Sequence, residues 1–364
     1  MELNSFNVQK HHQVNRSFFP FFSEFRSPDQ ILTVTIETVL LGMVLLISLL
    51  ANVCIIVLII KGKRLANFQC LVLNLFLADI VFVGVIPFII VVRWTGSWTL
   101  GPYVCHILFY AMATSGCVTI ITLAAISVER SIAILNLRLK SALHLKSMTA
   151  VVLTIWLFSA LVSLPLCIYF QMMSVQFNGQ ESVQICTLVW PSMMQEIIWD
   201  VFYSLVEFAI PGVIIVISYT KMLKIIKTAK RRLQANRPCS PYQQQIRVSK
   251  QDYQLFRTLL VLMISFFIMW TPIFLIIFLI LAQNFKSDLL LSSTWFFWVC
   301  AFTLTNSAVN PILYGSTQVK TKRQHVLHFF HLSHFKKRRN LAKVNALKKA
   351  RSQDQQTPPS IICN

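Results

Sequence analysis

Two acidic side chains inside long apolar stretches are the first residues in this chain that could do chemistry. Asp79 lies in the middle of LVLNLFLADIVF, and Glu207 lies in a second apolar stretch. A lone carboxylate in such surroundings is costly unless it is paired or neutralised. Thr119, Asn306 and Asn310 carry oxygen atoms of the kind that hard cations prefer. We therefore expect these three residues to surround Asp79, either in a cation site or in a hydrogen-bonded network around a protonated carboxylic acid.

A second chemical feature is the adjacent pair Glu129–Arg130. A neighbouring carboxylate can hold a guanidinium. Release of the arginine from the carboxylate would free the N–H groups of the guanidinium for another partner. The sequence shows no set of nucleophile, base and orienting residue, and its nine Cys have no CxxC or Cys/His spacing. It therefore predicts no catalytic residues, no zinc site and no enzyme.

The elements that must position these residues are apolar and long. The chain has 364 residues, of which 55% are hydrophobic and 13% charged, against about a quarter charged in soluble domains. Stretches of about 20 apolar residues can cross a bilayer, and in lipid they must be helices. The predicted fold class is an all-α membrane protein, a seven-transmembrane helix bundle. The seven expected spans are Ile31–Ile60, Phe68–Val92, Tyr103–Leu135, Met148–Met172, Glu196–Ile226, Phe256–Ala282 and Leu290–Tyr314.

Basic residues indicate the orientation of these spans. Of the 33 Lys and Arg, 28 fall in the loops and tail on one side and five on the other. The positive-inside rule then places the N-terminus outside and the C-terminus in the cytoplasm, as in a multi-pass protein of the plasma membrane. The same distribution explains the net charge of +20 without a nucleic-acid partner. Asn15-Arg16-Ser17 is a glycosylation acceptor pattern on the expected outer side.

Apolar residues recur at helical spacing among basic residues after Tyr314, and Lys336–Arg339 form a basic run. This pattern predicts a short amphipathic helix on the inner leaflet, with membrane lipids as partners. The expected parts are an extracellular N-terminal segment at 1–30, the bundle at 31–315, and a cytoplasmic amphipathic helix with a basic tail at 316–364.

Two cysteines are expected on the outer side. Cys105 opens the third span, and Cys186 lies in the long outer loop Gln171–Gln195. Because both would meet an oxidising compartment, we expect a disulfide that ties this loop over the mouth of the bundle. The alternative is two unpaired, small apolar residues.

The order of short motifs carries a resemblance. LLANVC, LNLFLAD, SVERS, FFIMWTP and NPILY follow one another, one to a span. Over about 31–330 the chain resembles the rhodopsin-like G-protein-coupled receptors. The resemblance implies an allosteric sodium ion at Asp79 that favours the inactive state, and it departs from the usual pattern at Ser131. The implied activation switches are Glu129, Arg130, Pro211, Tyr219, Phe266, Trp270, Pro272, Pro311 and Tyr314.

A narrower resemblance extends into the loops. NRSFFPFF, IPFIIVVRWTGSW and QIRVSKQDYQLFRTL are similar to segments of the long-chain free fatty acid receptors, the omega-3-sensitive group. This implies a receptor for medium- and long-chain, especially unsaturated, free fatty acids. The implied partners are heterotrimeric G proteins, of the Gq family first and Gi second, and arrestin. The alternative is a rhodopsin-like receptor for another lipid or a peptide; a transporter or channel would need internal repeats or charged relays.

The same resemblance implies a ligand site. Arg93, with Arg16, would meet the ligand carboxylate, although Arg93 could instead be an interfacial anchor. The residues that match an acyl-chain pocket, or alternatively a packed aromatic core, are Phe21, Phe82, Trp98, Phe109, Trp190, Trp199, Tyr203, Glu207, Trp270, Phe296 and Phe297.

Three positions depart from the resemblance: Phe18 stands where the group can have arginine, Tyr203 where it has Phe, and Glu207 where it has Asn. A carboxylate at 207 would repel an anionic headgroup or become protonated by burial. We therefore expect the acyl tail, rather than the headgroup, near Glu207, with that residue protonated or hydrogen-bonded.

Overall fold

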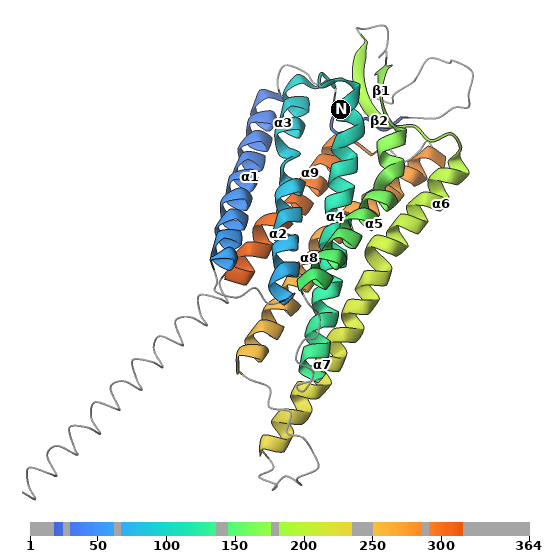
Figure 1. Cartoon of the computed structure of the whole chain (residues 1–364). Coiled ribbons are helices and arrows are strands. Elements are labelled where there is room, and N and C mark those ends of the chain that lie inside the picture. The colour runs from blue at the N-terminus through green and yellow to red at the C-terminus, as the bar shows by residue number, and fades with distance from the viewer. Residues whose placement is uncertain are drawn as a thin grey trace, which may run out of the picture. The chain divides into compact units, whose positions relative to one another are not determined.

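The computed structural model describes residues 18–24, 30–61, 67–135, 145–175, 182–234, 250–285 and 291–315. Within these ranges, seven helical stretches are long and apolar enough to span a membrane, as predicted (Figure 1). The elements are α1 (Ile31–Ile60), α2 (Asn67–Val83), α3 (Ile86–Thr95), α4 (Gly101–Leu135), α5 (Leu145–Tyr169), β1 (Phe170–Val175), β2 (Val183–Leu188), α6 (Met193–Ser204), the π-helical turn η2 (Leu205–Ala209), α7 (Ile210–Gln234), α8 (Lys250–Phe285) and α9 (Ser293–Leu304).

Three of the seven spans are interrupted helices. The second consists of α2 and α3, which are separated at Gly84–Val85, and Pro87 lies in the first turn of α3. Proline is tolerated there because its missing N–H would have no intrahelical partner. The fifth consists of α6, η2 and α7 in sequence, and the seventh continues from α9 through a turn at Thr305 into helix 306–315.

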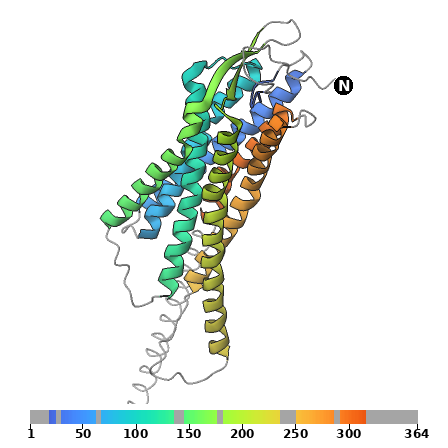
Figure 2. The same ribbon diagram turned by 90° about the vertical axis from the view of Figure 1, so that its right-hand side faces the viewer.

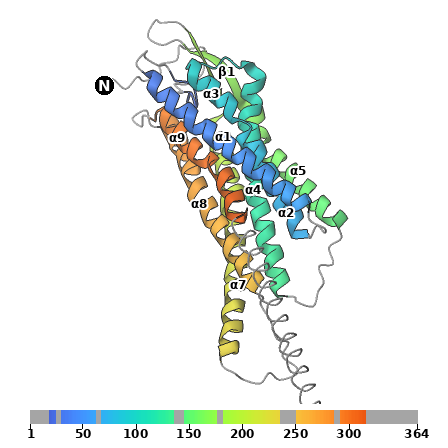
Figure 3. The same ribbon diagram turned by 90° about the vertical axis from the view of Figure 1, so that its left-hand side faces the viewer.

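Helix α4 is the element around which the others pack. It contacts α2, α5, α7 and α8, as well as β1 and η2. By contrast, α1 packs against α2 and α3 (Figure 3), and many of its apolar side chains are exposed. Exposed apolar side chains on a membrane-spanning helix suit contact with lipid. Residues on α4 are therefore well placed to connect the ends of the bundle.

A β-hairpin covers one end of the bundle, opposite the C-terminal end of α7 (Figure 2). β1 and β2 pair antiparallel, with Phe170 opposite Leu188 and Met172 opposite Cys186. The expectation that the fourth span continues to Met172 was therefore wrong, because the chain turns from helix to strand at Phe170. Sequence hydropathy does not separate the two, since both are apolar.

The amphipathic helix and basic tail expected at 316–364 lie outside the described residues, as do Asn15 and Arg16.

Candidate ligand-binding site

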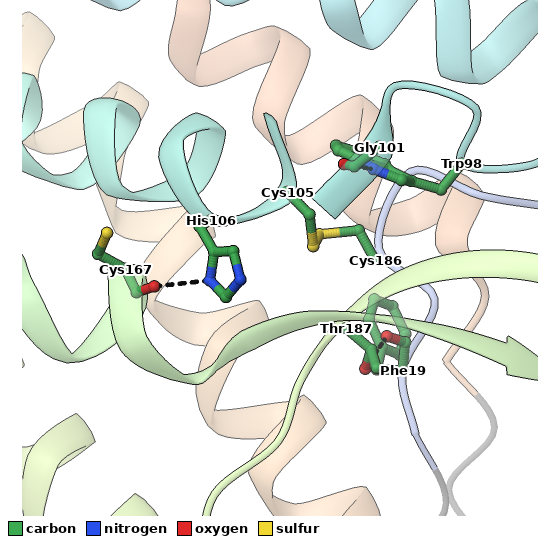
Figure 4. Close-up of a disulfide and its surroundings, with 8 residues drawn as sticks. All are labelled: Phe19, Trp98, Gly101, Cys105, His106, Cys167, Cys186 and Thr187. Carbon is green, nitrogen blue, oxygen red and sulfur yellow. Dashed lines mark hydrogen bonds between the residues drawn. A yellow bond between two sulfur atoms is a disulfide. The ribbon is translucent and has the colours of Figure 1, made fainter. Parts of the chain in front are cut away.

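A disulfide fixes the hairpin to the bundle. Cys105, in the second turn of α4, is bonded to Cys186 of β2 (Figure 4), which confirms the predicted bridge. The indole of Trp98 donates to the carbonyl of Gly101 at 2.9 Å, and its backbone N–H donates to Gln184 at 2.7 Å. The hairpin is thus held both to α4 and to the loop before it.

The N-terminal segment Phe18–Glu24 is packed into this mouth. The hydroxyl of Thr187 donates to the carbonyl of Phe19 at 2.8 Å (Figure 4). Phe21 adopts a left-handed backbone conformation, with φ of 49°, which non-glycine residues seldom take. Its ring lies 5.0 Å from Phe109 and 5.1 Å from Phe296. Phe22 is also buried and stacks on Phe109. The mouth is therefore covered by aromatic rings from the chain's own N-terminal segment.

Arg93 is buried in the last turn of α3, at the C-terminal end of the second span, and is held by two carboxylates. Its guanidinium donates to Glu37 of α1 at 2.7 and 2.9 Å, and it lies 3.0 Å from an oxygen of Glu24. It also faces the ring of Phe297 at 4.6 Å. Thr294 donates to both oxygens of Glu24 at 2.7–2.8 Å. Arg93 is thus an internal ion-pair centre that joins α1, the N-terminal segment and the second span.

One apolar cavity lies below this cover, with about 1000 Å³ of empty space when its open side is included. Eight of the eleven residues expected around an acyl chain line it: Phe21, Phe82, Phe109, Trp199, Tyr203, Glu207, Trp270 and Phe296. Trp98, Trp190 and Phe297 do not: Trp98 fixes the hairpin, Trp190 packs on Tyr169 and Trp199, and Phe297 packs under Arg93. Arg93 does not line the cavity either.

The sequence analysis missed several residues of the site. Phe170 stacks on Phe109 at 3.9 Å, and Phe274 lies 6.4 Å from Tyr203. Glu196 and Asp200 also line the cavity. The first strand of a hairpin gives no helical pattern that would have indicated Phe170. The two acids are four residues apart, however, so a helical projection would place them beside Glu207.

Glu207 lies in the π-helical turn η2 and is 2% exposed. A π-turn adds one residue to a helical turn, so it changes which side chains face inward, and such turns are frequent at functional sites. The polar neighbours of the Glu207 side chain are the Tyr203 hydroxyl and the Cys117 thiol. Its Oε1 atom has no hydrogen-bond partner in the described part of the chain. Glu207 therefore adds a buried carboxyl group to the wall of the cavity.

At the floor of the cavity, Trp270 stacks between Phe82 and Phe266, with ring centroids 5.2 Å from each. Both Phe266 and Trp270 belong to α8, which contains Pro272. A Cβ atom at Gly116 of α4 would lie 2.4 Å from the Trp270 ring. Only glycine at 116 allows the indole this position, so α4 and α8 are closely packed at the floor of the cavity.

A buried polar group lies deeper in the bundle. Asn310 donates to both oxygens of Asp79, at 2.9 and 3.2 Å, and Asn52 donates to the carbonyl of Ser307 at 2.9 Å. Both polar atoms of the Asn306 side chain and Oδ1 of Asn310 are buried without a hydrogen-bond partner among the described residues. Thr119 is buried on α4. The Oδ1 atom of Asn310, on the side chain that contacts Asp79, is an oxygen of the kind that hard cations prefer as a ligand.

The other residues that the sequence marks as possible activation switches lie on α4, α7 and helix 306–315. Arg130 is paired with the adjacent Glu129 through both Nε and Nη2, the latter at 2.6 Å. Tyr219 of α7 is buried and packs on Phe256, and Tyr314 packs on Phe76. Pro211 follows η2, and Pro311 lies within helix 306–315. The Arg130 guanidinium is therefore held by Glu129 of its own helix, and it also lies over the Phe68 ring of α2, 4.4 Å from the ring centroid.

The class of protein follows from these features together with comparison to known families. Residues 51–314 match the family model described as 7 transmembrane receptor (rhodopsin family), so the chain belongs to the rhodopsin family of seven-transmembrane receptors. It is a multi-pass membrane receptor rather than an enzyme. Membership implies a ligand and G-protein partners.

The chain is also similar to individual receptors. The chain is 49% identical over 312 residues to free fatty acid receptor 4 of Rattus norvegicus, covering 85% of this chain and 86% of the relative. It is 50% identical to free fatty acid receptor 4 of Mus musculus over 305 residues, covering 83% and 84%. Galanin receptor type 1 of Rattus norvegicus is 28% identical over 291 residues, 77% of this chain and 78% of the relative. These matches confirm the predicted resemblance to the fatty acid receptors.

Proposed function

We propose that the chain is a receptor for medium- and long-chain, especially unsaturated, free fatty acids. The observation that carries this proposal is the aromatic-lined cavity, considered with about 50% identity to receptors named for free fatty acids. An acyl chain offers few polar atoms, so its affinity must come from burial. Ten buried methylenes would contribute about 8 kcal/mol before ordering costs.

In this proposal Arg93 binds the ligand carboxylate, assisted by Arg16. Arg93 already binds two carboxylates, and Glu24 is the more exposed of them, at 25% against 1% for Glu37. A ligand headgroup would therefore replace Glu24 rather than Glu37. The acyl chain would extend from the mouth past Phe21 and Phe109 toward Trp270. This route places the tail, and not the headgroup, beside Glu207.

Signal transfer would run through α8. An acyl chain that displaces the Trp270 ring would alter its stacking on Phe266 and the bend at Pro272, because a proline within a helix removes a backbone hydrogen bond and allows a kink. Movement of α8 would in turn release Arg130 from Glu129 for contact with a G protein and Tyr219. Pro211, Pro311 and Tyr314 would act as further switches in α7 and helix 306–315.

A sodium ion would stabilise the resting state. Asp79 would hold it, with Asn306, Asn310 and Thr119 as neighbouring oxygen donors; the unpartnered amide oxygens described above fit this role. Bound there, the ion supplies charge neutralisation for Asp79.

The proposed setting is the plasma membrane, with the N-terminus and the hairpin outside. Residues 1–30 would form the extracellular segment, 31–315 the bundle, and 316–364 a cytoplasmic amphipathic helix and basic tail on anionic lipids. The partners would be Gq-family proteins first, Gi proteins second, and arrestin. The tail holds few Ser and Thr, so arrestin recruitment should be weaker than in a Ser/Thr-rich receptor.

The test is a dose–response series of fatty acids from C8 to C22 in transfected cells, read by calcium release and arrestin recruitment. We expect a response that strengthens with chain length and unsaturation. Silence across the series, with receptor demonstrated at the cell surface, would reject fatty acids in favour of another lipid or a peptide.

A further inference from the structure

The cavity wall formed by α6 and η2 is acidic. Glu196, Asp200 and Glu207 all line the cavity and are at most 7% exposed. Glu196 and Asp200 are one helical turn apart, and η2 brings Glu207 to the same wall. Among the described residues that line the cavity there is no Lys, Arg or His. The cavity itself therefore favours a cation over an anion.

Glu207 has a hydrogen-bond acceptor that the described residues leave unsatisfied. Its Oε1 is buried and has no hydrogen-bond partner among the described residues. A buried charged acceptor left unsatisfied costs more than a neutral one. The indole N–H groups of Trp199 and Trp270 also lack acceptors, but they are neutral donors, whereas the Glu207 carboxyl group can ionise and pair with a cation. A hydrogen-bond donor that reaches this oxygen must come from the cavity.

Aromatic residues line the same cavity as Glu207. Trp199 stacks on Tyr203 at 4.6 Å, and Phe274 lies 6.4 Å from Tyr203. Ring faces attract cations, and the attraction is strongest where water is excluded. A carboxylate set among ring faces is the combination that binds an ammonium group.

We propose that the cavity binds long-chain alkylammonium amphiphiles, with the ammonium on Glu207 and the alkyl chain along the apolar wall. This ligand class goes beyond the proposed fatty-acid function and rests only on the same cavity being the ligand site. The two ligands would bind in opposite orientations. A fatty acid places its headgroup at the mouth near Arg93 and its tail beside Glu207, whereas an alkylamine places its headgroup at Glu207.

The test uses the purified full-length receptor in lipid nanodiscs and measures thermal stability against ligand concentration. The probes are tetradecylamine, tetradecanoic acid and tetradecanol, which share an alkyl chain and differ in headgroup. We expect tetradecylamine to stabilise the wild type, and Glu207→Gln to raise the required amine concentration at least tenfold. The acid should bind Glu207→Gln as well as the wild type or better. Glu207→Asp, which keeps the charge on a shorter side chain, should retain part of the amine effect.

Asp200→Asn is the matched control, because it removes one carboxylate from the same wall; its effect on the amine should be clearly smaller. An equal loss in the Asp200 and Glu207 variants would overturn the assignment to Glu207, as would equal stabilisation by tetradecanol and tetradecylamine, or no amine effect on the wild type. If the acid binds and the amine does not, only this inference fails. If the amine binds and the acid does not, the fatty-acid proposal fails and this inference stands.

Discussion

Arg93 is held by two carboxylates of unequal burial, and that difference determines what each one does. Glu37 is 1% exposed, so it cannot be solvated if the arginine leaves. Glu24 is partly exposed and belongs to a short segment held by its hydrogen bonds and aromatic contacts. Glu37 is therefore the structural partner, and Glu24 is the partner that a ligand can replace.

Replacing Glu24 with Gln should make fatty acids more potent. The change removes the charge that occupies Arg93 but keeps the size of the side chain. Because exposed ion pairs are typically worth about 0.2–1 kcal/mol, the expected gain is about 1.4- to fivefold in half-maximal concentration. Calcium-release curves would show it, with Thr35→Val as a control, since the Thr35 hydroxyl donates to the Ile31 carbonyl of its own helix at an exposed site. Reduced potency would contradict the assignment of Arg93 to the headgroup.

Removing Arg93 alone should destabilise the receptor for a reason unrelated to ligand. Arg93→Leu leaves Glu37 buried without its partner, which typically costs about 3–5 kcal/mol. The double variant Arg93→Leu/Glu37→Leu should recover most of the lost melting temperature, because no buried charge then lacks a partner.

Fatty-acid potency should remain low in both of these variants. If the double variant recovered potency together with stability, Arg93 would be a structural residue alone.

At the scale of elements, the contact between α4 and α8 is the one most open to a direct test. Gly116→Ala would bring a Cβ within 2.4 Å of the Trp270 ring, so the ring must shift. Overpacking of this kind costs about 1–3 kcal/mol. The cost falls on the state seen here, in which Arg130 is paired with Glu129, so basal signalling should rise and the melting temperature should fall.

Gly42→Ala is the matched control on α1, since a Cβ there meets no atom within 4 Å; it should change neither quantity. Inositol phosphate accumulation without agonist provides the measurement. Unchanged basal signalling in a folded Gly116→Ala receptor would show that the position of the Trp270 ring does not set the signalling state of the receptor.

At the scale of the whole molecule, a cation at Asp79 would couple the centre of the bundle to the ligand cavity. We expect agonist affinity to fall when sodium replaces a large organic cation at constant ionic strength. Asp79→Asn should abolish that difference, because the ion loses its charged ligand. Radioligand binding in the two salts measures the effect, and sodium sensitivity that survives in Asp79→Asn would place the ion elsewhere.

The spans were predictable because bilayer thickness fixes a minimum apolar length. The expected first span coincides with α1, and the others differ from the structure by a few residues at their ends. The breaks within spans were not predicted. Polar residues occur at Thr305 and in η2, but hydropathy averaged over a span does not register a change in helical hydrogen bonding.

The candidate site was predictable where residue type decided the outcome and not where pairing did. Large aromatic residues such as Phe109 and Trp270 line the cavity as expected. Glu37 was overlooked as the partner of Arg93, because 56 residues separate them and no local pattern joins them. The feature of the sequence that could have indicated a role for Glu37 is that it is a single acid within the apolar first span.

The salt link between Glu24 and Arg93 has a consequence for how affinity is measured. Glu24 belongs to the receptor itself, so under the proposed binding of the ligand carboxylate to Arg93 it would compete at a local concentration that dilution cannot change, in the millimolar range for short tethers. A dissociation constant measured for a free acid would then combine two quantities: the affinity of Arg93 for the acid and its affinity for Glu24. Washing or purification would leave this internal competitor in place, whereas cleavage of the chain just beyond residue 24 would remove it.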